Sequence, residues 1–383
     1  MTRSRSLLAA TLLCFGLGTA VAHADIVPIN ETGKIRLDGA DRYEVSANIS
    51  AKVAETPQRI VIVASGEVYA DALAAGPVGA FLDAPILLVR KGVIPPAVQA
   101  ELVRLAPDDI YLMGGPNTIS EDVADELEAI GGADVTRFSG ADRYAVAAFI
   151  SRGFSDLDTI YIASGQLFSD ALSAGPAAAK EGGAILLTRQ TALPAATETV
   201  LTNREPAKVV IVGGPATISQ GVEDRVAALL PDAEVVRYQG RDRYEVAANV
   251  ARALWPGGAT RAFYASGEKF PDALAGTPAT GASDAPILLT TATCHPYDTA
   301  QWTTEVAPGL EVLLGGPASA YGGTDACGPA PAYGNFPEDL DCADFASQEE
   351  AQAWFDYWEP RVGDVYDLDG DDDGLVCEIW PPQ

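Results

Sequence analysis

Short runs of apolar residues alternate along the chain with stretches that have the apolar spacing of helices. In the first part of the pattern the apolar runs lie at residues 60–64, 85–89 and 110–113, and a further strand is expected at 134–138. Continuous apolar runs of this length are typical of strands buried on both faces of a parallel sheet. Helices are predicted between them at 43–53, 71–82, 96–105 and 120–130. This alternation predicts an α/β fold with right-handed crossovers.

The pattern is triplicated, with a period of about 100 residues. The segment Arg36-Leu-Asp-Gly-Ala-Asp-Arg-Tyr43 returns at 137–144 and at 237–244. Ala-Ser-Gly followed by Asp-Ala-Leu, and later Gly-Gly-Pro, recur in the same phase. No linker separates the copies, so we expect them to pack against each other as a pseudo-threefold disc in a monomer. The third copy has no room for its last helix.

Candidate binding residues cluster where the predicted strands end. The carboxyl edge of a parallel sheet is the usual ligand site, and glycines there let backbone N–H groups approach an anion. A tight strand-to-helix turn would explain the Gly-Gly-Pro segments equally well. The candidates at this edge are Ser65, Ser164, Ser266, Gly114, Gly213 and Gly315.

The arginines of the repeated segment are the second set of candidates. A cation at a helix start is mildly unfavourable, so other groups must hold it. One alternative is an ion pair with Asp38, Asp41 or Asp71 or their counterparts, and the other is a polymer phosphate or carboxylate. The arginines concerned are Arg36, Arg42, Arg137, Arg143, Arg237 and Arg243, and the tyrosines that follow (Tyr43, Tyr144, Tyr244) are expected to pack in the core.

A hydrolase is disfavoured by the absence of a repeated base. Each candidate serine lies between a strand and a glycine, but beyond the first 24 residues the sequence has a single histidine, His295, in one copy only. A repeated Ser-His pair is therefore impossible. A Gly-x-Gly-x-x-Gly cofactor turn is also missing after the predicted strands.

Composition and targeting signals indicate an exported protein. Residues 1–24 have the basic, apolar and small-residue regions of a signal peptide, and no later apolar run is long enough for a membrane span. The net charge of −28 excludes nucleic acid as a partner. Four cysteines remain after the signal, as two local pairs, Cys294 with Cys327 and Cys342 with Cys377, although four cysteines allow three connectivities.

The repeated motifs resemble the cell wall binding repeat type 2 family. The similarity includes the strands that begin Ile86-Leu87-Leu88, Ile185 and Ile287, and it covers residues 34–133, 134–235 and a truncated 236–322. The resemblance implies a wall-anchoring module of three domains that attaches non-covalently to an anionic wall polymer. Direct packing in a buried strand is the expected role of the Ile-Leu-Leu run.

An acidic tail follows a linker at 323–335. Residues 336–383 contain 15 acidic side chains and one arginine, and the tail ends in alternating carboxylates before Gly374 and Cys377-Glu378. This arrangement suits a hard cation, although the spacing conflicts with an ordinary EF-hand. The tail resembles the excalibur family of small calcium-binding domains, which implies a disulfide-stapled fold and Ca²⁺ ligands at Asp369, Asp371, Asp373 and Glu378, with Asp367 as a further candidate.

These observations together predict a non-enzymatic, exported wall-binding protein with a calcium-binding tail. A wall-active hydrolase that uses carboxylates is one alternative. A calcium-dependent adhesin, whose tail contacts a partner, is another.

Overall fold

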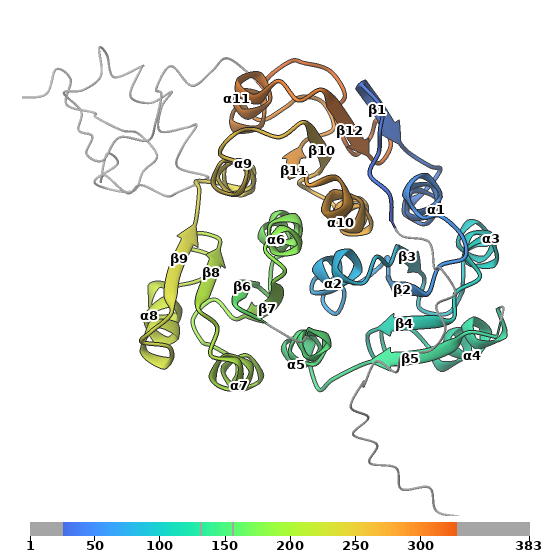
Figure 1. Ribbon diagram of the computed structural model, residues 1–383, viewed down its shortest axis with the longest axis horizontal. Helices are drawn as coiled ribbons and strands as arrows, with labels where there is room; N and C mark the ends of the chain where they lie inside the picture. Colours follow the sequence, from blue (N-terminus) through green and yellow to red (C-terminus); the bar gives the residue numbers. More distant parts are fainter. Residues whose placement is uncertain (1–25, 131, 155–156, 328–383) are drawn as a thin grey trace, which may run out of the picture.

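Three parallel sheets of four strands form the body of the protein (Figure 1). The structure is a computed structural model that describes residues 26–130, 132–154 and 157–327. Each sheet places its first buried strand second in the order, and parallel neighbours are joined through helices as in an α/β fold. The first sheet consists of β3 (Ile86–Val89), β2 (Ile60–Ser65), β4 (Asp109–Met113) and β5 (Asp134–Phe138). The second consists of β7 (Ala184–Thr188), β6 (Thr159–Ser164), β8 (Lys208–Val212) and β9 (Glu234–Tyr238).

The third sheet takes its fourth strand from the other end of the chain. Its order is β11 (Ile287–Thr290), β10 (Arg261–Ser266), β12 (Leu310–Leu314) and β1 (Gly33–Leu37). Strand β1 runs parallel to β12, with Gly33 opposite Leu310 and Leu37 opposite Leu314. The segment before β1 is anchored as well, because Ile26 and Ile29 are buried. The N-terminal strand therefore closes the three sheets into a ring.

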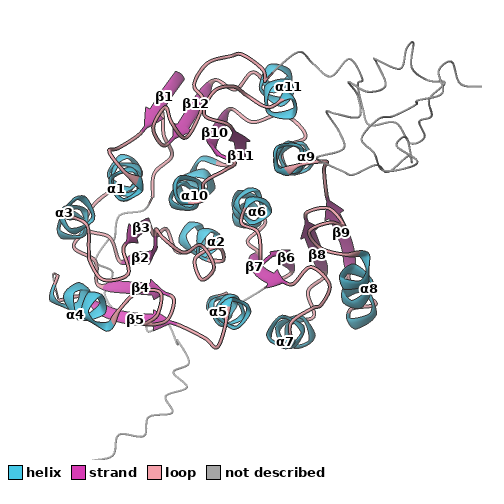
Figure 2. Cartoon of the chain, turned by 180° about the vertical axis from the view of Figure 1, so that it is seen from behind, coloured by secondary structure: helices cyan, strands magenta, loops and turns pink. Residues whose placement is uncertain are grey.

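Helices fill the centre of the ring and the spaces between sheets (Figure 2). The central helices α2 (Ala75–Phe81), α6 (Ser169–Lys180) and α10 (Pro271–Ser283) contact one another. Small residues allow this approach: a Cβ on Gly76 would lie 2.9 Å from Cγ2 of Thr277. Helices α1 (Arg42–Val53), α5 (Arg143–Ile150) and α9 (Arg243–Leu254) cover β3, β7 and β11. A single 3₁₀ turn, Ser151–Gly153, follows α5.

The remaining helices lie at the rim, and the two with predicted bounds, at 96–105 and 120–130, agree with the structure within a residue at each end. They are α3 (Pro96–Leu105), α4 (Glu121–Ala129), α7 (Ala195–Arg204), α8 (Gln220–Leu229) and α11 (Tyr297–Val306). The helix expected at 71–82 begins only at Ala75, because Asp71 does not cap it. Its Oδ2 instead accepts a hydrogen bond from Thr118 Oγ1 at 2.8 Å. Up to residue 327, no helix follows β12, as the truncated third copy predicted.

The sheets and the sequence repeats divide the chain at different places. Strand β5, which starts the second repeat in sequence, is the last strand of the first sheet. Helix α5 directly after it packs on β7 of the second sheet. Each Arg-x-x-Gly-x-Asp-Arg-Tyr segment therefore crosses from one sheet to the next.

Candidate functional site

The first arginine of each repeated segment binds the Gly-Gly-Pro turn of the sheet in which its strand lies. Arg137 Nη1 donates to the carbonyl oxygens of Gly114 at 3.0 Å and Ile119 at 2.9 Å. The same pair of bonds joins Arg237 to Gly213 and Ile218, and Arg36 to Gly315 and Ala320. These guanidinium groups hold the turn after the third buried strand. A contact with polymer stays a prediction for Arg36, Arg137 and Arg237.

The second arginine of each segment binds the next sheet. Arg243 Nη1 donates to the carbonyl oxygen of Gly267 at 2.6 Å, and Arg42 and Arg143 donate to Gly66 and Gly165 in the same way. The expected partners Asp38 and Asp41 are not those that hold these cations. Asp41 instead caps α1, as Asp142 caps α5 and Asp242 caps α9, by accepting two backbone N–H groups. The segment therefore fastens neighbouring sheets together.

Buried carboxylates of neighbouring repeats face these arginines. Burial raises the pKa of Asp170 to about 6, and the charge of Arg243 from the third repeat opposes that rise. Burial likewise raises the pKa of Asp272 to about 6, opposed by Arg42 from the first repeat. Attraction across the repeat boundaries thus reduces the electrostatic cost of burying these carboxylates. Asp170 and Asp272 are counterparts of Asp71, which the sequence suggested as a partner of these arginines. Each of them, however, faces an arginine from a different repeat.

The three candidate serines hold their own turns. Each serine is 1% exposed, and its hydroxyl accepts hydrogen bonds from the backbone N–H groups two and three residues further on, as Ser65 Oγ does from Glu67 and Val68 at 3.1 Å. Ser164 and Ser266 make the equivalent bonds. The serines therefore shape the edge of each sheet, and contact between their side chains and a polymer remains a prediction.

The glycines of the Gly-Gly-Pro segments make tight strand-to-helix turns. Gly114, Gly213 and Gly315 have φ values of +113°, +122° and +93°, which L-residues rarely adopt. Their N–H groups extend the ladder to the next strand, for example from Gly114 to Phe138 O at 2.8 Å. These N–H groups are already bonded, so the structure favours the turn over the anion cradle as their role.

Each tyrosine of the repeated segment packs edge-on against the glycine that follows the serine. Tyr43 is 3% exposed, and a Cβ on Gly66 would lie only 2.6 Å from its Cε1. The same approach joins Tyr144 to Gly165 and Tyr244 to Gly267. The expectation that these rings pack in the core is confirmed for Tyr43 and Tyr144, whereas Tyr244 is partly buried and packs against the core. The close approach also explains why glycine ends the Ala-Ser-Gly run.

Two exposed arginines from outside the repeated segment cover two of these rings. The guanidinium carbon of Arg90 lies 4.5 Å from the centroid of Tyr43, and that of Arg189 lies 4.7 Å from the centroid of Tyr144. Both follow the last residue of a buried strand. An arginine directly after the Ile-Leu-Leu strand was the signal that could have identified them.

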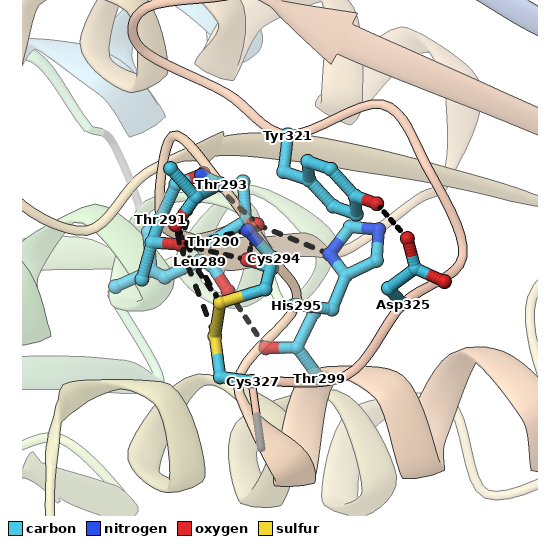
Figure 3. The surroundings of a disulfide bond; sticks show 10 residues. All are labelled: Leu289, Thr290, Thr291, Thr293, Cys294, His295, Thr299, Tyr321, Asp325 and Cys327. Carbon is cyan, nitrogen blue, oxygen red and sulfur yellow. Dashed lines mark hydrogen bonds between the residues drawn. A yellow bond between two sulfur atoms is a disulfide. The ribbon is translucent and has the colours of Figure 1, made fainter.

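In the third repeat, the loop after the Ile-Leu-Leu strand has no such arginine and instead contains a disulfide between Cys294 and Cys327 (Figure 3). The adjacent His295 is 2% exposed, its Nδ1 lies 3.1 Å from Thr290 Oγ1, and burial lowers its pKa. Its ring packs between Tyr264 and Tyr321. The disulfide pairing predicted for these two cysteines is confirmed, and the histidine lies in a packed structural position.

Other predicted features lie outside the described residues. These are the signal segment 1–24, the pair Cys342 and Cys377, and the calcium ligands Asp367, Asp369, Asp371, Asp373 and Glu378. Within residues 26–327 that the structure describes, His, Cys, Asp and Glu side chains form no group suited to a metal ion. No described helix has the length and apolar character needed to cross a membrane.

Comparison with known sequences identifies the class of protein. The family described as "Cell wall binding domain 2 (CWB2)" matches residues 36–124, 137–223 and 237–326. The chain therefore belongs to the CWB2 family, and its three repeats are three copies of that domain.

Individual relatives carry similar segments within longer chains. The N-acetylmuramoyl-L-alanine amidase LytC of Bacillus subtilis is 29% identical over 67% of this chain and 50% of its own. The amidase enhancer of the same organism is 30% identical over 66% of this chain and 34% of its own. Two solved structures from Clostridium difficile, Cwp6 and Cwp8, each superpose with a TM-score of 0.69 over 75% of this chain, at 26% and 27% identity, and over 46% and 50% of their own chains. The chain spans half or less of each of these relatives.

Proposed function

We propose that the ring of three sheets is a non-catalytic anchor that attaches the protein to an anionic polymer of the cell wall. The observation that carries this proposal is the CWB2 match in all three copies, joined in a closed ring. The relatives named for amidase activity or its enhancement extend well beyond the aligned segments. The in-phase serines are 1% exposed and bonded to backbone N–H groups, which favours a binding role over nucleophilic catalysis.

Binding to purified walls tests this proposal. The full chain should sediment with walls from which protein has been removed, and should not release soluble wall fragments during the incubation. Sedimentation in EDTA should be similar if the ring alone provides attachment. Release of fragments would favour the hydrolase alternative, and sedimentation that disappears in EDTA would favour the calcium-dependent adhesin.

We further propose that the acidic tail binds Ca²⁺. Support comes from the alternating carboxylates of residues 367–378 and from Cys342 and Cys377 in the same tail. Bound to oxygen ligands, the ion would neutralise the repulsion between carboxylates and link metal binding to folding. Calorimetric titration of the full chain with Ca²⁺ should show one binding event that Asp371→Asn together with Asp373→Asn removes. Heat unchanged by these substitutions would contradict the assignment.

A further inference from the structure

The three repeats place an equivalent residue at the exposed end of each Ile-Leu-Leu strand. The strand register defines this position, because the N–H of the Ala-Ser-Gly glycine donates to the last strand residue in every copy, as Gly66 does to Val89 O at 2.9 Å. The next residue is Arg90 in the first repeat, Arg189 in the second and Thr291 in the third. Two of the three equivalent positions are therefore cationic.

Both arginines lie exposed on a rigid support. Their side chains are 49% and 54% exposed, and each stacks on a tyrosine that belongs to the core of its repeat. Arg90 lies 3.8 Å from Asp41 and 3.7 Å from Glu67, and Arg189 lies 3.9 Å from Asp142. These separations exceed a normal hydrogen bond, so the carboxylates orient the guanidinium groups without saturating their donors.

The third position is closed in a different way (Figure 3). Thr291 Oγ1 donates to the carbonyl oxygen of Cys294 at 2.8 Å and accepts from its N–H at 3.1 Å. Tyr321 N–H donates to the carbonyl oxygen of Thr291 at 2.9 Å. A short neutral side chain is thus turned into the disulfide loop, and this repeat presents no cation at the equivalent place.

We infer that Arg90 and Arg189 bind the anionic groups of the wall polymer, and that this pseudo-threefold ring has two such positions instead of three. The inference rests on the wall-binding function proposed above. A guanidinium stacked on a fixed ring is preorganised to donate two parallel hydrogen bonds to a phosphate or carboxylate. The chain carries a net charge of −28, so an anionic polymer is attracted only where cations are locally exposed.

The two positions have different charged neighbours but the same balance of charge. Glu67 beside Arg90 is replaced by Gln166 in the second repeat, where its Oε1 accepts from the N–H of Gln190 as Glu67 does from Lys91. The exposed cation Lys91 offsets the additional carboxylate of Glu67, and both residues have neutral counterparts beside Arg189. We therefore expect Arg90 and Arg189 to contribute similarly to binding.

Sedimentation with protein-free walls tests the inference in the full chain. Arg189→Gln and Arg90→Gln should each weaken apparent affinity about tenfold, and the double variant should lose about a hundredfold because two linked contacts are removed. Added salt should weaken the wild type and leave the double variant nearly unaffected. The double Arg→Lys variant should retain more affinity than the double Gln variant because it keeps both charges.

Two controls separate this binding site from general charge and from folding. Arg225→Gln removes an arginine of similar exposure, 51%, that pairs with Glu198 on the rim, and should bind walls like the wild type. Thr291→Ala should also bind normally.

Two outcomes would overturn the inference and leave wall attachment standing. One is a double Gln variant that binds like the wild type, and the other is a Thr291→Ala variant that loses binding at an unchanged melting temperature. A wild type that does not bind walls would overturn the proposed function itself. Walls stripped of phosphate polymers distinguish phosphate from carboxylate as the bound group.

Discussion

The first two repeats and the third build the same sheet from different parts. In the first two, a helix follows the Gly-Gly-Pro turn, and its acidic side chain pairs with the first arginine, as Glu121 does with Arg137 at 3.1 Å and Glu223 with Arg237 at 2.8 Å. The third repeat has a disulfide loop in place of this helix and takes its edge strand from the N-terminus. Covalent linkage and a distant strand thus replace local packing where the repeat is truncated.

Removing the N-terminal strand should produce the largest effect. A chain that begins at Asp38 loses β1 and the hydrogen bonds of Arg36. It also loses the burial of Ile26 and Ile29, and burying one such side chain contributes roughly 1.5–3 kcal/mol. We expect a loss of about 5 kcal/mol or more in the free energy of unfolding, measured by urea denaturation against a chain that begins at Asp25. Hydrogen exchange should accelerate in β12 and much less in β4. Equal acceleration in both strands would contradict the expectation that pairing with β1 stabilises the third sheet more than the first.

The disulfide should have the next largest effect, again confined to the third repeat. Replacing Cys294 and Cys327 with serine removes a cross-link with a sequence separation of 33 residues. The chain-entropy estimate for such a loop is about 4 kcal/mol. Chemical denaturation of the double variant should show this loss. If stability is unchanged, packing around His295 and Tyr321 holds the loop without the bond.

Substitution of the glycines that contact the repeated tyrosines should reduce stability by a smaller amount, and by different amounts in different repeats. In Gly66→Ala the new Cβ would press on Tyr43, which is buried and cannot move away, so we expect a cost of about 1–3 kcal/mol. Gly267→Ala should cost less, because Tyr244 is only partly buried and can shift. Gly92→Ala is the control, since its Cβ would meet no atom within 4 Å. Similar melting temperatures for Gly66→Ala and Gly92→Ala would contradict this account.

The sequence predicts what depends on local pattern. Buried strands read as apolar runs, so β2, β3 and β4 begin and end within a residue of their expected positions. The helix expected at 120–130 starts as predicted, because Ser120 caps α4 through a bond from the N–H of Val123 and acidic residues follow in the first turn. The repeated motifs also correctly predict three parallel-sheet units.

Relations between distant residues could not be predicted from pattern. The period assigns β1 to the first repeat, yet its pairing with β12 depends on which sheet has an open edge. The repeated arginines bind mainly backbone carbonyl oxygens, and every residue has such an acceptor, so no sequence signal marks the partner. The stacking of Arg90 and Arg189 on tyrosines could not be predicted, because it becomes visible only once the strands are placed.

The pairing of β1 with β12 has a consequence for the order of assembly. The ribosome makes the first strand of the ring before the repeat that will receive it, so β1 must wait for the last sheet while the two intervening units take shape. The final step joins the two ends of the domain, and only then does the last sheet have all four strands. The two ends of the domain therefore depend on each other, although more than 270 residues separate β1 from β12 along the chain.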